Sequence, residues 1–158
     1  MRDLEIIAMA ITAAEMGVLV FGTLHTNNAA KTCDRIISVF PSGEQEAIKA
    51  VLGETLRAVV AQQLIPKLGG GRVAAIEILF SSPAIGNMIR EGKTPQITSA
   101  IQTGVKEGMC IMENVVLELY NQKKITKETA LLNVSTRNVR QKIDPASPPS
   151  TPPIGGKT

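Results

Sequence analysis

Residues 18–25 read Val-Leu-Val-Phe-Gly-Thr-Leu-His, a continuous apolar run that ends at the chain's one histidine. A run that is apolar on both sides predicts a strand covered on both faces, as in a parallel sheet. Before it, apolar residues recur with helical spacing over 4–16. Asp3 stands where it can cap that helix, and Gly17 stands where it can end it. A helix followed by a doubly covered strand predicts an α/β fold.

The strand expected over 18–24 lacks a parallel partner in the sequence. Parallel neighbours are reached through crossovers of about a dozen residues or more, and no second run of this kind is present. We therefore expect the rest of its sheet before Met1 or in another chain. Downstream, the patterns predict helices at 29–40, 44–62, 112–122 and 126–134, strands at 63–68 and 72–80 joined by Gly69-Gly70-Gly71, and helix starts at Ser82-Pro83 and Thr94-Pro95.

Composition limits the classes of function. The chain has 158 residues, of which 44% are hydrophobic and 20% charged, as in an ordinary globular protein. Only 3% are aromatic, which leaves few platforms for stacking single-stranded nucleic acid. Cys33 and Cys110 lack metal-ligand neighbours and imply no disulfide framework. Neither a signal-peptide pattern nor an apolar run of about 20 residues is found, so a reducing cytoplasm is expected.

Three regions differ in composition. Residues 1–80 hold the α/β pattern, 81–143 are expected to be helical, and 144–158, rich in Pro, Ser, Thr and Gly, are expected to be disordered. Most of the +3 net charge arises between Lys123 and Lys142, where six Lys or Arg residues accompany one Glu. A solvated helix face explains this excess more simply than an anionic partner, and nucleic acid is not expected as a partner.

A series of short motifs runs through residues 1–120 in a fixed order. The series comprises Met1-Arg-Asp-Leu-Glu5, Val20-Phe-Gly-Thr-Leu-His-Thr-Asn27, Ala29-Ala-Lys-Thr32, Phe40-Pro41, Gly69-Gly-Gly-Arg-Val-Ala-Ala75, Pro83-Ala-Ile85, Ile89-Arg-Glu91 and Ser99-Ala-Ile-Gln-Thr-Gly104. Together these motifs resemble the PilT-like pilus retraction ATPases within the type II and type IV secretion ATPases. The resemblance implies an α/β fold, namely the carboxyl-terminal part of a RecA-like P-loop ATPase domain with a helical extension.

The resemblance implies roles for residues just before the first predicted helix and just after the predicted strand. His25 stands in a segment similar to the family's His box, which implies a place near the γ-phosphate of ATP, with Thr26 and Asn27 beside it. The residue pattern agrees, because open α/β sheets bind ligands beyond the carboxyl ends of their strands. Taken alone, His25 would be a surface-loop histidine. Arg2 and Asp3 are explained equally well as phosphate-site support and as a helix cap with a solvated Arg.

A second stretch resembles the motif that the family links with retraction, Ala-Ile-Arg-Asn-Leu-Ile-Arg-Glu. The matching positions here are Ala84, Ile85, Asn87, Ile89, Arg90 and Glu91. Gly86 replaces the first Arg of the motif. The replacement removes a charge and places glycine inside a helix, where it is about 1 kcal/mol less favourable than Ala. A retracting and a regulatory role for the motif therefore both stay open.

Two parts of the family's ATPase site are expected to be missing. The glutamate that polarises the attacking water would precede Met1. Gly155-Gly-Lys-Thr158 resembles only the end of a phosphate-binding loop, because Thr151 stands where the pattern requires Gly. The resemblance implies ATP and Mg²⁺ for the intact family, but tight nucleotide binding and ATPase activity are not expected of this chain alone. No metal site is predicted from its own residues.

Three interpretations of function stay open. The first is a segment of an ATP-hydrolysing motor that powers type IV pilus retraction in twitching motility. The second is an inactive assembly module that docks on intact motor subunits, and the third is a truncated gene product. The resemblance implies a homo-oligomer that is a hexameric ring in the family. It also implies pilus inner-membrane platform proteins as partners and a cytoplasmic location at the periphery of the inner membrane.

Overall fold

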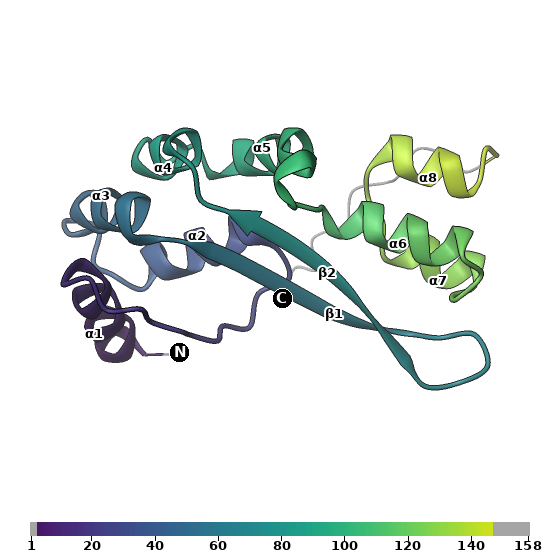
Figure 1. Ribbon diagram of the computed structural model, residues 1–158, viewed down its shortest axis with the longest axis horizontal. Helices are drawn as coiled ribbons and strands as arrows, with labels where there is room; N and C mark the ends of the chain where they lie inside the picture. The colour runs from purple at the N-terminus through teal and green to yellow at the C-terminus, as the bar shows by residue number, and fades with distance from the viewer. Residues whose placement is uncertain (1–2, 147–158) are drawn as a thin grey trace, which may run out of the picture. The chain divides into compact units, whose positions relative to one another are not determined.

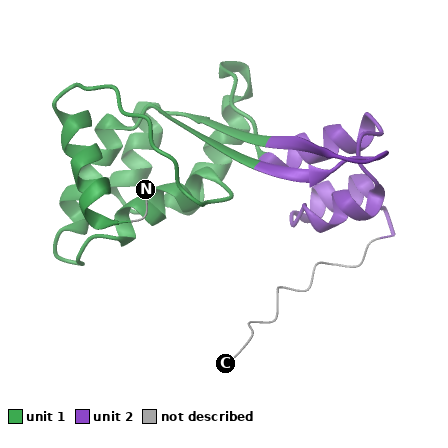
Figure 2. Ribbon diagram, turned by 90° about the horizontal axis from the view of Figure 1, so that it is seen from below, with its two compact units in different colours: residues 1–62, 76–111 green, residues 63–75, 112–158 purple. Residues whose placement is uncertain are grey.

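A computed structural model describes residues 3–146 and divides them into two compact units, which Figure 2 distinguishes by colour. Unit 1 holds residues 3–62 and 76–111, and unit 2 holds 63–75 and 112–146. Figure 1 labels helices α1 (Leu4–Glu15), α2 (Ala29–Ser38), α3 (Gln45–Thr55), α4 (Pro83–Arg90), α5 (Ile97–Thr103), α6 (Met112–Asn121), α7 (Lys127–Leu132) and α8 (Arg137–Ile143), and strands β1 (Ala58–Pro66) and β2 (Arg72–Phe80). Two 3-10 helices, η1 (Thr94–Gln96) and η2 (Gly104–Glu107), lie between α4 and α6.

Strands β1 and β2 form the sheet of the described residues, as a hairpin turned by three glycines. Gly69, Gly70 and Gly71 have backbone φ angles of 84°, 101° and 75°, a region that side chains with a Cβ rarely adopt. The predicted hairpin is confirmed. Its first strand begins at Ala58 rather than at residue 63, and the helix predicted over 44–62 ends at Thr55. Cross-strand pairing with β2 overrides the local helical spacing.

The strand predicted over 18–24 is wrong for the described chain. These residues form an irregular, extended connection between α1 and α2 (Figure 1), and they are not buried. Val18, Leu19 and Phe21 are 57%, 70% and 88% exposed. A strand covered on both faces requires hydrogen-bonded neighbours, and within residues 3–146 the β1–β2 hairpin does not extend to this segment.

Helix α1 begins and ends where the sequence predicts. Asp3 occupies the N-cap position, although its side chain makes no capping hydrogen bond with the described residues. At the other end Gly17 has φ +86°, and the Val18 N–H donates to the Ala13 carbonyl oxygen at 3.0 Å. This pair of features closes the helix as a Schellman motif does. Among the described residues, no helix is long and apolar enough to cross a membrane.

The core of unit 1 is aliphatic and gathers side chains from its helices and from the hairpin. Its buried members are Ala29, Cys33, Ile37, Leu52, Val59, Leu79, Ile85, Ile89, Ile97, Ile101, Met109 and Ile111. Burial, followed by the negative charge of Asp34, raises the pKa of the Cys33 thiol to about 12. The thiol is therefore protonated and unreactive while unit 1 is folded.

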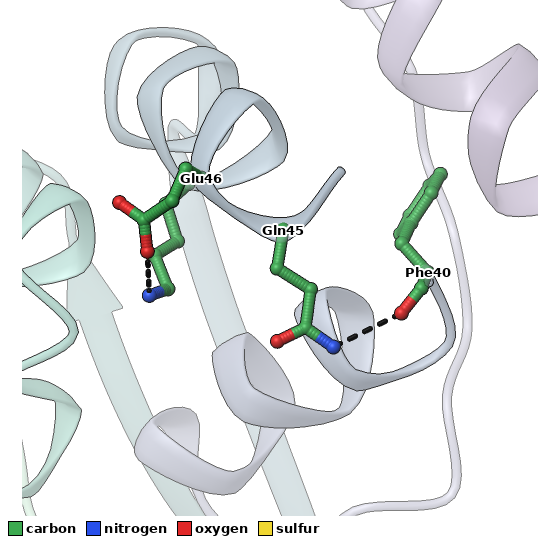
Figure 3. A network of polar contacts seen from close by, with 4 residues as sticks. Phe40, Gln45 and Glu46 are labelled. Carbon is green, nitrogen blue, oxygen red and sulfur yellow. Dashed lines mark hydrogen bonds and ion pairs between the residues drawn. The ribbon is translucent and has the colours of Figure 1, made fainter. Parts of the chain in front are cut away.

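A side-chain hydrogen bond holds the turn from α2 to α3 (Figure 3). The amide nitrogen Nε2 of Gln45 donates to the Phe40 carbonyl oxygen at 3.0 Å, while Glu46 and Lys49 form an ion pair at 2.7 Å on the same helix. Phe40 is buried, and the bond from Gln45 supplies its carbonyl oxygen with a hydrogen-bond donor. The break expected between the helices predicted over 29–40 and 44–62 is thus confirmed, and Pro41, Ser42 and Gly43 lie in it.

Unit 2 is a small helical body with a core of its own. Its buried side chains are Ile65, Ala75, Met112, Val116, Leu119, Ile125, Ala130, Val134, Val139 and Ile143. Helix α7 starts with Thr126 at its N-cap, where Thr126 Oγ1 accepts from the Thr129 N–H at 3.2 Å. The helix predicted over 126–134 is confirmed in this shorter form, and α8 adds a helix that was not predicted separately. The boundaries expected at residues 80 and 143 stay predictions.

Candidate functional site

The loop from His25 to Asn28 leads directly into α2 and is tied to that helix by short hydrogen bonds. Asn28 is the N-cap, and its Oδ1 accepts from the Lys31 N–H at 2.8 Å. The hydroxyl oxygens of Thr26 and Thr32 lie 2.7 Å apart, and Thr32 Oγ1 donates to the Asn28 carbonyl oxygen at 2.9 Å. Because the cap and both threonines act together, the loop has a defined exit into the helix.

The first N–H group of α2 is bound by a residue that sequence reasoning missed. The Ala29 N–H donates to Glu77 Oε1 at 2.8 Å, and both residues are buried. Glu77 lies in β2, in the run Ala-Ala-Ile-Glu-Ile-Leu. A signal was available: strand alternation places residue 77 on the same face as Leu79, where a carboxylate is unusual. Its partner could not be inferred, because 48 positions separate the two residues.

The predicted site residues differ in their setting. His25 and Asn27 are exposed and Thr26 is half-buried, all in the loop before α2. Asp3 is exposed at the start of α1. Arg2 lies outside the described residues, as do residues 147–158 of the predicted tail, including Gly155-Gly-Lys-Thr158. The structure therefore places Thr26 against the start of α2 and leaves the phosphate-site roles as predictions.

Helix α4 carries the motif that resembles the family's retraction sequence. Ser82 caps the helix, with its Oγ accepting from the Ile85 N–H at 3.3 Å, and Pro83 takes the first helical position, as predicted. The motif divides into two faces. Ile85, Gly86 and Ile89 are buried, whereas Ala84, Asn87, Arg90 and Glu91 are exposed.

The structure explains why residue 86 is glycine, which the sequence alone did not reveal. Helices α3 and α4 cross with their backbones in contact at Gly53 and Gly86. A Cβ atom built on Gly53 would lie 2.7 Å from the Gly86 carbonyl oxygen, and one built on Gly86 would collide with the Gly53 carbonyl oxygen. Glycine at both positions permits the close approach. At the position where the family motif has Arg, this chain therefore has a glycine that allows α3 and α4 to pack closely.

A surface pocket of about 290 Å³ opens beside this crossing. Its lining residues are Gly53, Glu54, Arg57, Ser81, Ser82, Pro83, Gly86 and Arg90. Arg90 lies 3.6 Å from the Glu54 carboxylate and also donates to the Asn87 side chain. The lining carries one negative charge, Glu54, and two positive charges, Arg57 and Arg90, so the pocket has a small positive excess. The second expected helix start, Thr94, instead opens η1, and its hydroxyl donates to Asp34 Oδ1 at 2.6 Å.

The basic cluster between residues 123 and 142 is partly engaged inside unit 2. Arg140 Nη1 donates to the carbonyl oxygens of Leu131 and Val134 at 2.7 and 2.9 Å, which satisfies the end of α7. Lys127 lies 3.1 Å from the Asp144 carboxylate. Among residues 3–146, no group of three or more His, Cys, Asp and Glu side chains is placed to hold a metal ion.

Comparison with known proteins decides the family. The sequence model of the type II/IV secretion system protein family matches residues 1–147. The chain belongs to this family. Its predicted resemblance to the pilus retraction ATPases is confirmed by sequence: the type IV pilus retraction ATPase PilT of Pseudomonas aeruginosa is 52% identical over 130 residues. A twitching motility protein of Neisseria gonorrhoeae is 52% identical over 131 residues.

The solved structures of family members agree with the fold. A crystal structure of the pilus retraction motor PilT with bound ADP matches 87% of this chain with a TM-score of 0.76 and 43% identity. The ATPase DotB of Legionella pneumophila matches 84% of the chain, with a TM-score of 0.71 and 30% identity. The predicted α/β fold of the secretion ATPases is therefore confirmed.

This secretion-family chain spans less than half the length of these relatives. The alignments cover 82% of the chain and 38% of the Pseudomonas PilT, and 82% of the chain and 35% of the Neisseria protein. The structural matches cover 38% of the PilT chain and 36% of the DotB chain.

Proposed function

We propose that this chain is a carboxyl-terminal segment of an ATP-hydrolysing motor that powers type IV pilus retraction. The sequence identity of 52% to a pilus retraction ATPase over 130 residues carries the proposal. In this proposal the motor is a hexameric ring at the cytoplasmic face of the inner membrane and acts on pilus platform proteins. ATP and Mg²⁺ bind the assembled motor, and the 158-residue chain taken alone is proposed to be inactive.

His25 is proposed to face the γ-phosphate, with Thr26 and Asn27 beside it. Support comes from the loop that carries these residues, since it is exposed and yet tied to α2 by the Thr26–Thr32 and Asn28–Lys31 bonds. A side chain presented from a fixed loop can stabilise charge that develops on a transferred phosphoryl group without reorganising first. Arg2 and Asp3 are proposed to support the phosphate site. Helix α4, which carries the retraction-like motif, is proposed to transmit the motion that ATP hydrolysis produces.

A chimaera tests the catalytic part of this proposal. Residues 3–146 of this chain replace the matching stretch of Pseudomonas PilT, and ATP hydrolysis is measured at several ATP concentrations. We expect the chimaera to be active and His25→Ala to lower kcat about tenfold, which corresponds to about 1.4 kcal/mol. KM should change little, because most phosphate contacts are made by other residues of the motor.

Lys31→Ala is the matched control, since Lys31 is exposed on α2 and contributes only its backbone N–H to the cap. A His25→Ala chimaera with unchanged kcat would contradict the role of His25. For the separate 158-residue chain, calorimetry should detect no saturable micromolar nucleotide binding. Such binding would show that the proposed inactivity of the chain is wrong.

An assembly module is the second candidate function, and the exposed apolar segment 18–21 favours it. Val18, Leu19 and Phe21 are more than half exposed in the separate chain, and an unpaired extended segment of this kind can add to the sheet of another subunit. The proposed partner is an intact subunit of the same motor. Truncation of a longer gene product stays a third alternative and predicts no such docking.

Size-exclusion chromatography with intact Pseudomonas PilT tests the docking function. We expect the chain to co-migrate with PilT, and Phe21→Asp to weaken the association roughly tenfold or more, since burying a Phe side chain contributes about 1.5–3 kcal/mol. Leu132→Asp is the control, because Leu132 is 85% exposed on α7, away from the segment in sequence. Absence of co-migration at micromolar concentrations would remove the support for this function.

A further inference from the structure

Glu77 places a carboxylate on the buried face of β2, where apolar side chains are usual. Glu77 is 5% exposed in β2, and Leu79, two positions later on the same face, is fully buried in the core of unit 1. Taking a carboxylate out of water costs several kcal/mol unless hydrogen bonds compensate for the lost hydration. A residue of this kind calls for a specific partner, which the structure supplies.

That partner is the first N–H of α2. The first turn of any helix leaves N–H groups without acceptors inside the helix, and Ala29 is fully buried, so water does not reach its N–H. Glu77 Oε1 accepts this N–H at 2.8 Å. The carboxylate also lies at the positive end of the α2 dipole, which favours a negative group there. One side chain of the hairpin therefore satisfies the start of the helix that follows the His25 loop.

The hydrogen bonds around this loop join residues that are either close together or far apart in the sequence. Thr26–Thr32 and Asn28–Lys31 join residues within a single stretch of the chain and so determine the local shape of the loop. The Ala29–Glu77 bond joins residues 48 positions apart and fixes where that shape sits relative to β2. Ala29 follows Asn28 directly, and only three residues separate it from His25.

We propose that Glu77 is a positioning residue that anchors the His25–Asn28 loop to β2. The hydrogen bond to Ala29 holds the loop and the hairpin in one arrangement, so that the His25 side chain is presented from a fixed place. The catalytic meaning of this anchor rests on the proposed function, in which His25 faces the γ-phosphate. The anchor itself does not depend on a nucleotide and can be measured in the chain without one.

The test compares three substitutions in the whole 158-residue chain. Glu77→Met keeps the bulk of the side chain but removes the acceptor, Glu77→Gln keeps an acceptor oxygen, and Leu79→Ala weakens the same face of the same strand without touching the bond. Amide hydrogen exchange and ¹H–¹⁵N spectra report Ala29 and residues 25–28. Leu79→Ala is the matched control because Leu79 and Glu77 share one face of β2.

With Glu77→Met, we expect exchange at the Ala29 amide to speed up about tenfold more than exchange at other protected amides of unit 1, because a hydrogen bond contributes about 1 kcal/mol or somewhat more. Signals of residues 25–28 should shift or broaden. With Glu77→Gln, exchange at Ala29 should stay within about threefold of the native rate. With Leu79→Ala, all amides of unit 1 should speed up together.

The proposal is overturned if Ala29 responds to Glu77→Met no more than to Leu79→Ala. If Glu77→Met does not fold, the spectrum of Glu77→Gln decides instead. The Ala29 amide signal should then show the largest shift in α2, and an unchanged Ala29 signal would overturn the proposal.

Activity is measured separately in the PilT chimaera. Glu77→Met should lower kcat about as much as His25→Ala while leaving KM almost unchanged, and Glu77→Gln should recover most of the loss. If the exchange results hold but neither Glu77→Met nor His25→Ala affects kcat, the proposed role of His25 fails and the anchor stands. If His25→Ala lowers kcat and Glu77→Met does not, the positioning role of Glu77 is wrong.

Discussion

Gly86→Arg, which restores the arginine of the pilus retraction motif, is expected to destabilise unit 1 by about 3 kcal/mol, at the upper end of typical overpacking effects. A Cβ on residue 86 meets the Gly53 backbone carbonyl, which has no rotamer through which to move aside. Helices α3 and α4 would have to separate, and that separation would expose part of the core that includes Leu52, Ile85 and Ile89. The Arg that the family motif has at this position would therefore destabilise unit 1 of this chain.

Two probes make the measurement specific to one unit. Cys33 lies in the core of unit 1, and the chain's one tyrosine, Tyr120, packs against the core of unit 2. Urea unfolding is followed by labelling of the Cys33 thiol and by tyrosine fluorescence. We expect Gly86→Arg to move the Cys33 transition to lower urea and to leave the fluorescence transition almost in place. Ala84→Arg, at an exposed position of the same helix, is the control and should move neither.

Gly86→Ala distinguishes two opposite expectations for the stability of unit 1. Helix propensity alone predicts that Ala at an interior position stabilises α4 by about 1 kcal/mol. The contact with Gly53 predicts the opposite, because even a methyl group is too large for the crossing. A more stable Gly86→Ala variant would show that the two helices can move apart at little cost, and the packing explanation of Gly86 would be wrong.

Glu113→Ala is expected to destabilise unit 2 by about 2 kcal/mol, as the loss of a strong helix cap does. Glu113 Oε1 accepts from the Ser135 N–H at 2.8 Å and from the Ser135 hydroxyl at 2.6 Å, and the Thr136 N–H lies 3.1 Å from Oε2. Thr136 is the N-cap of α8 and makes no capping bond with its own side chain in the described chain. Glu113 of α6 thus caps α8 from outside.

The same carboxylate predicts a dependence on pH. Burial acts to raise the pKa of Glu113, but the hydrogen bonds from Ser135 and Thr136 outweigh it and hold the pKa below the usual 4.5. A folded-state pKa below the unfolded one means that the stabilisation is fully present above the unfolded pKa. It is lost as the pH falls below 4.5 and through the lower pKa of the folded state.

Tyrosine fluorescence during urea unfolding at pH 7 and at a series of pH values below 5 measures both effects. Glu113→Ala should show the lower stability at pH 7 and a smaller decline toward acid than the native chain. Glu118→Ala is the matched control, since Glu118 is exposed on the same helix and its side chain bonds only to Gln122 among the described partners. Equal acid declines in the native chain and in Glu113→Ala would refute the capping role.

The elements that sequence patterns predicted correctly are those with local causes. The three-glycine hairpin follows from backbone geometry at Gly69–Gly71, and the start of α4 follows from Ser82-Pro83. The failures needed distant information. The apolar run 18–24 has the composition of a buried strand, but composition does not supply the neighbours that such a strand requires. Residues 58–62 have helical spacing, and only pairing with β2 makes them a strand.

The candidate site follows the same division. The segment from His25 to Asn27 could be proposed from the sequence because its residues are contiguous and resemble a family motif. Glu77 and Gly53 were missed as partners because each acts on a residue more than 30 positions away, Ala29 and Gly86 respectively. A single sequence marks each as locally unusual, a charge in an apolar strand or a glycine in a helix, but does not identify what it contacts.

The exposed run at residues 18–24 also affects how the chain fares in a cell. It carries no charge and no proline, and it is rich in Val, Leu and Phe, which is the composition of segments that stack into cross-β fibrils. An uncovered segment of this kind is a target for chaperones and proteases as much as for self-association. The amount of the chain in a cell should therefore rise and fall with the supply of whatever covers this run.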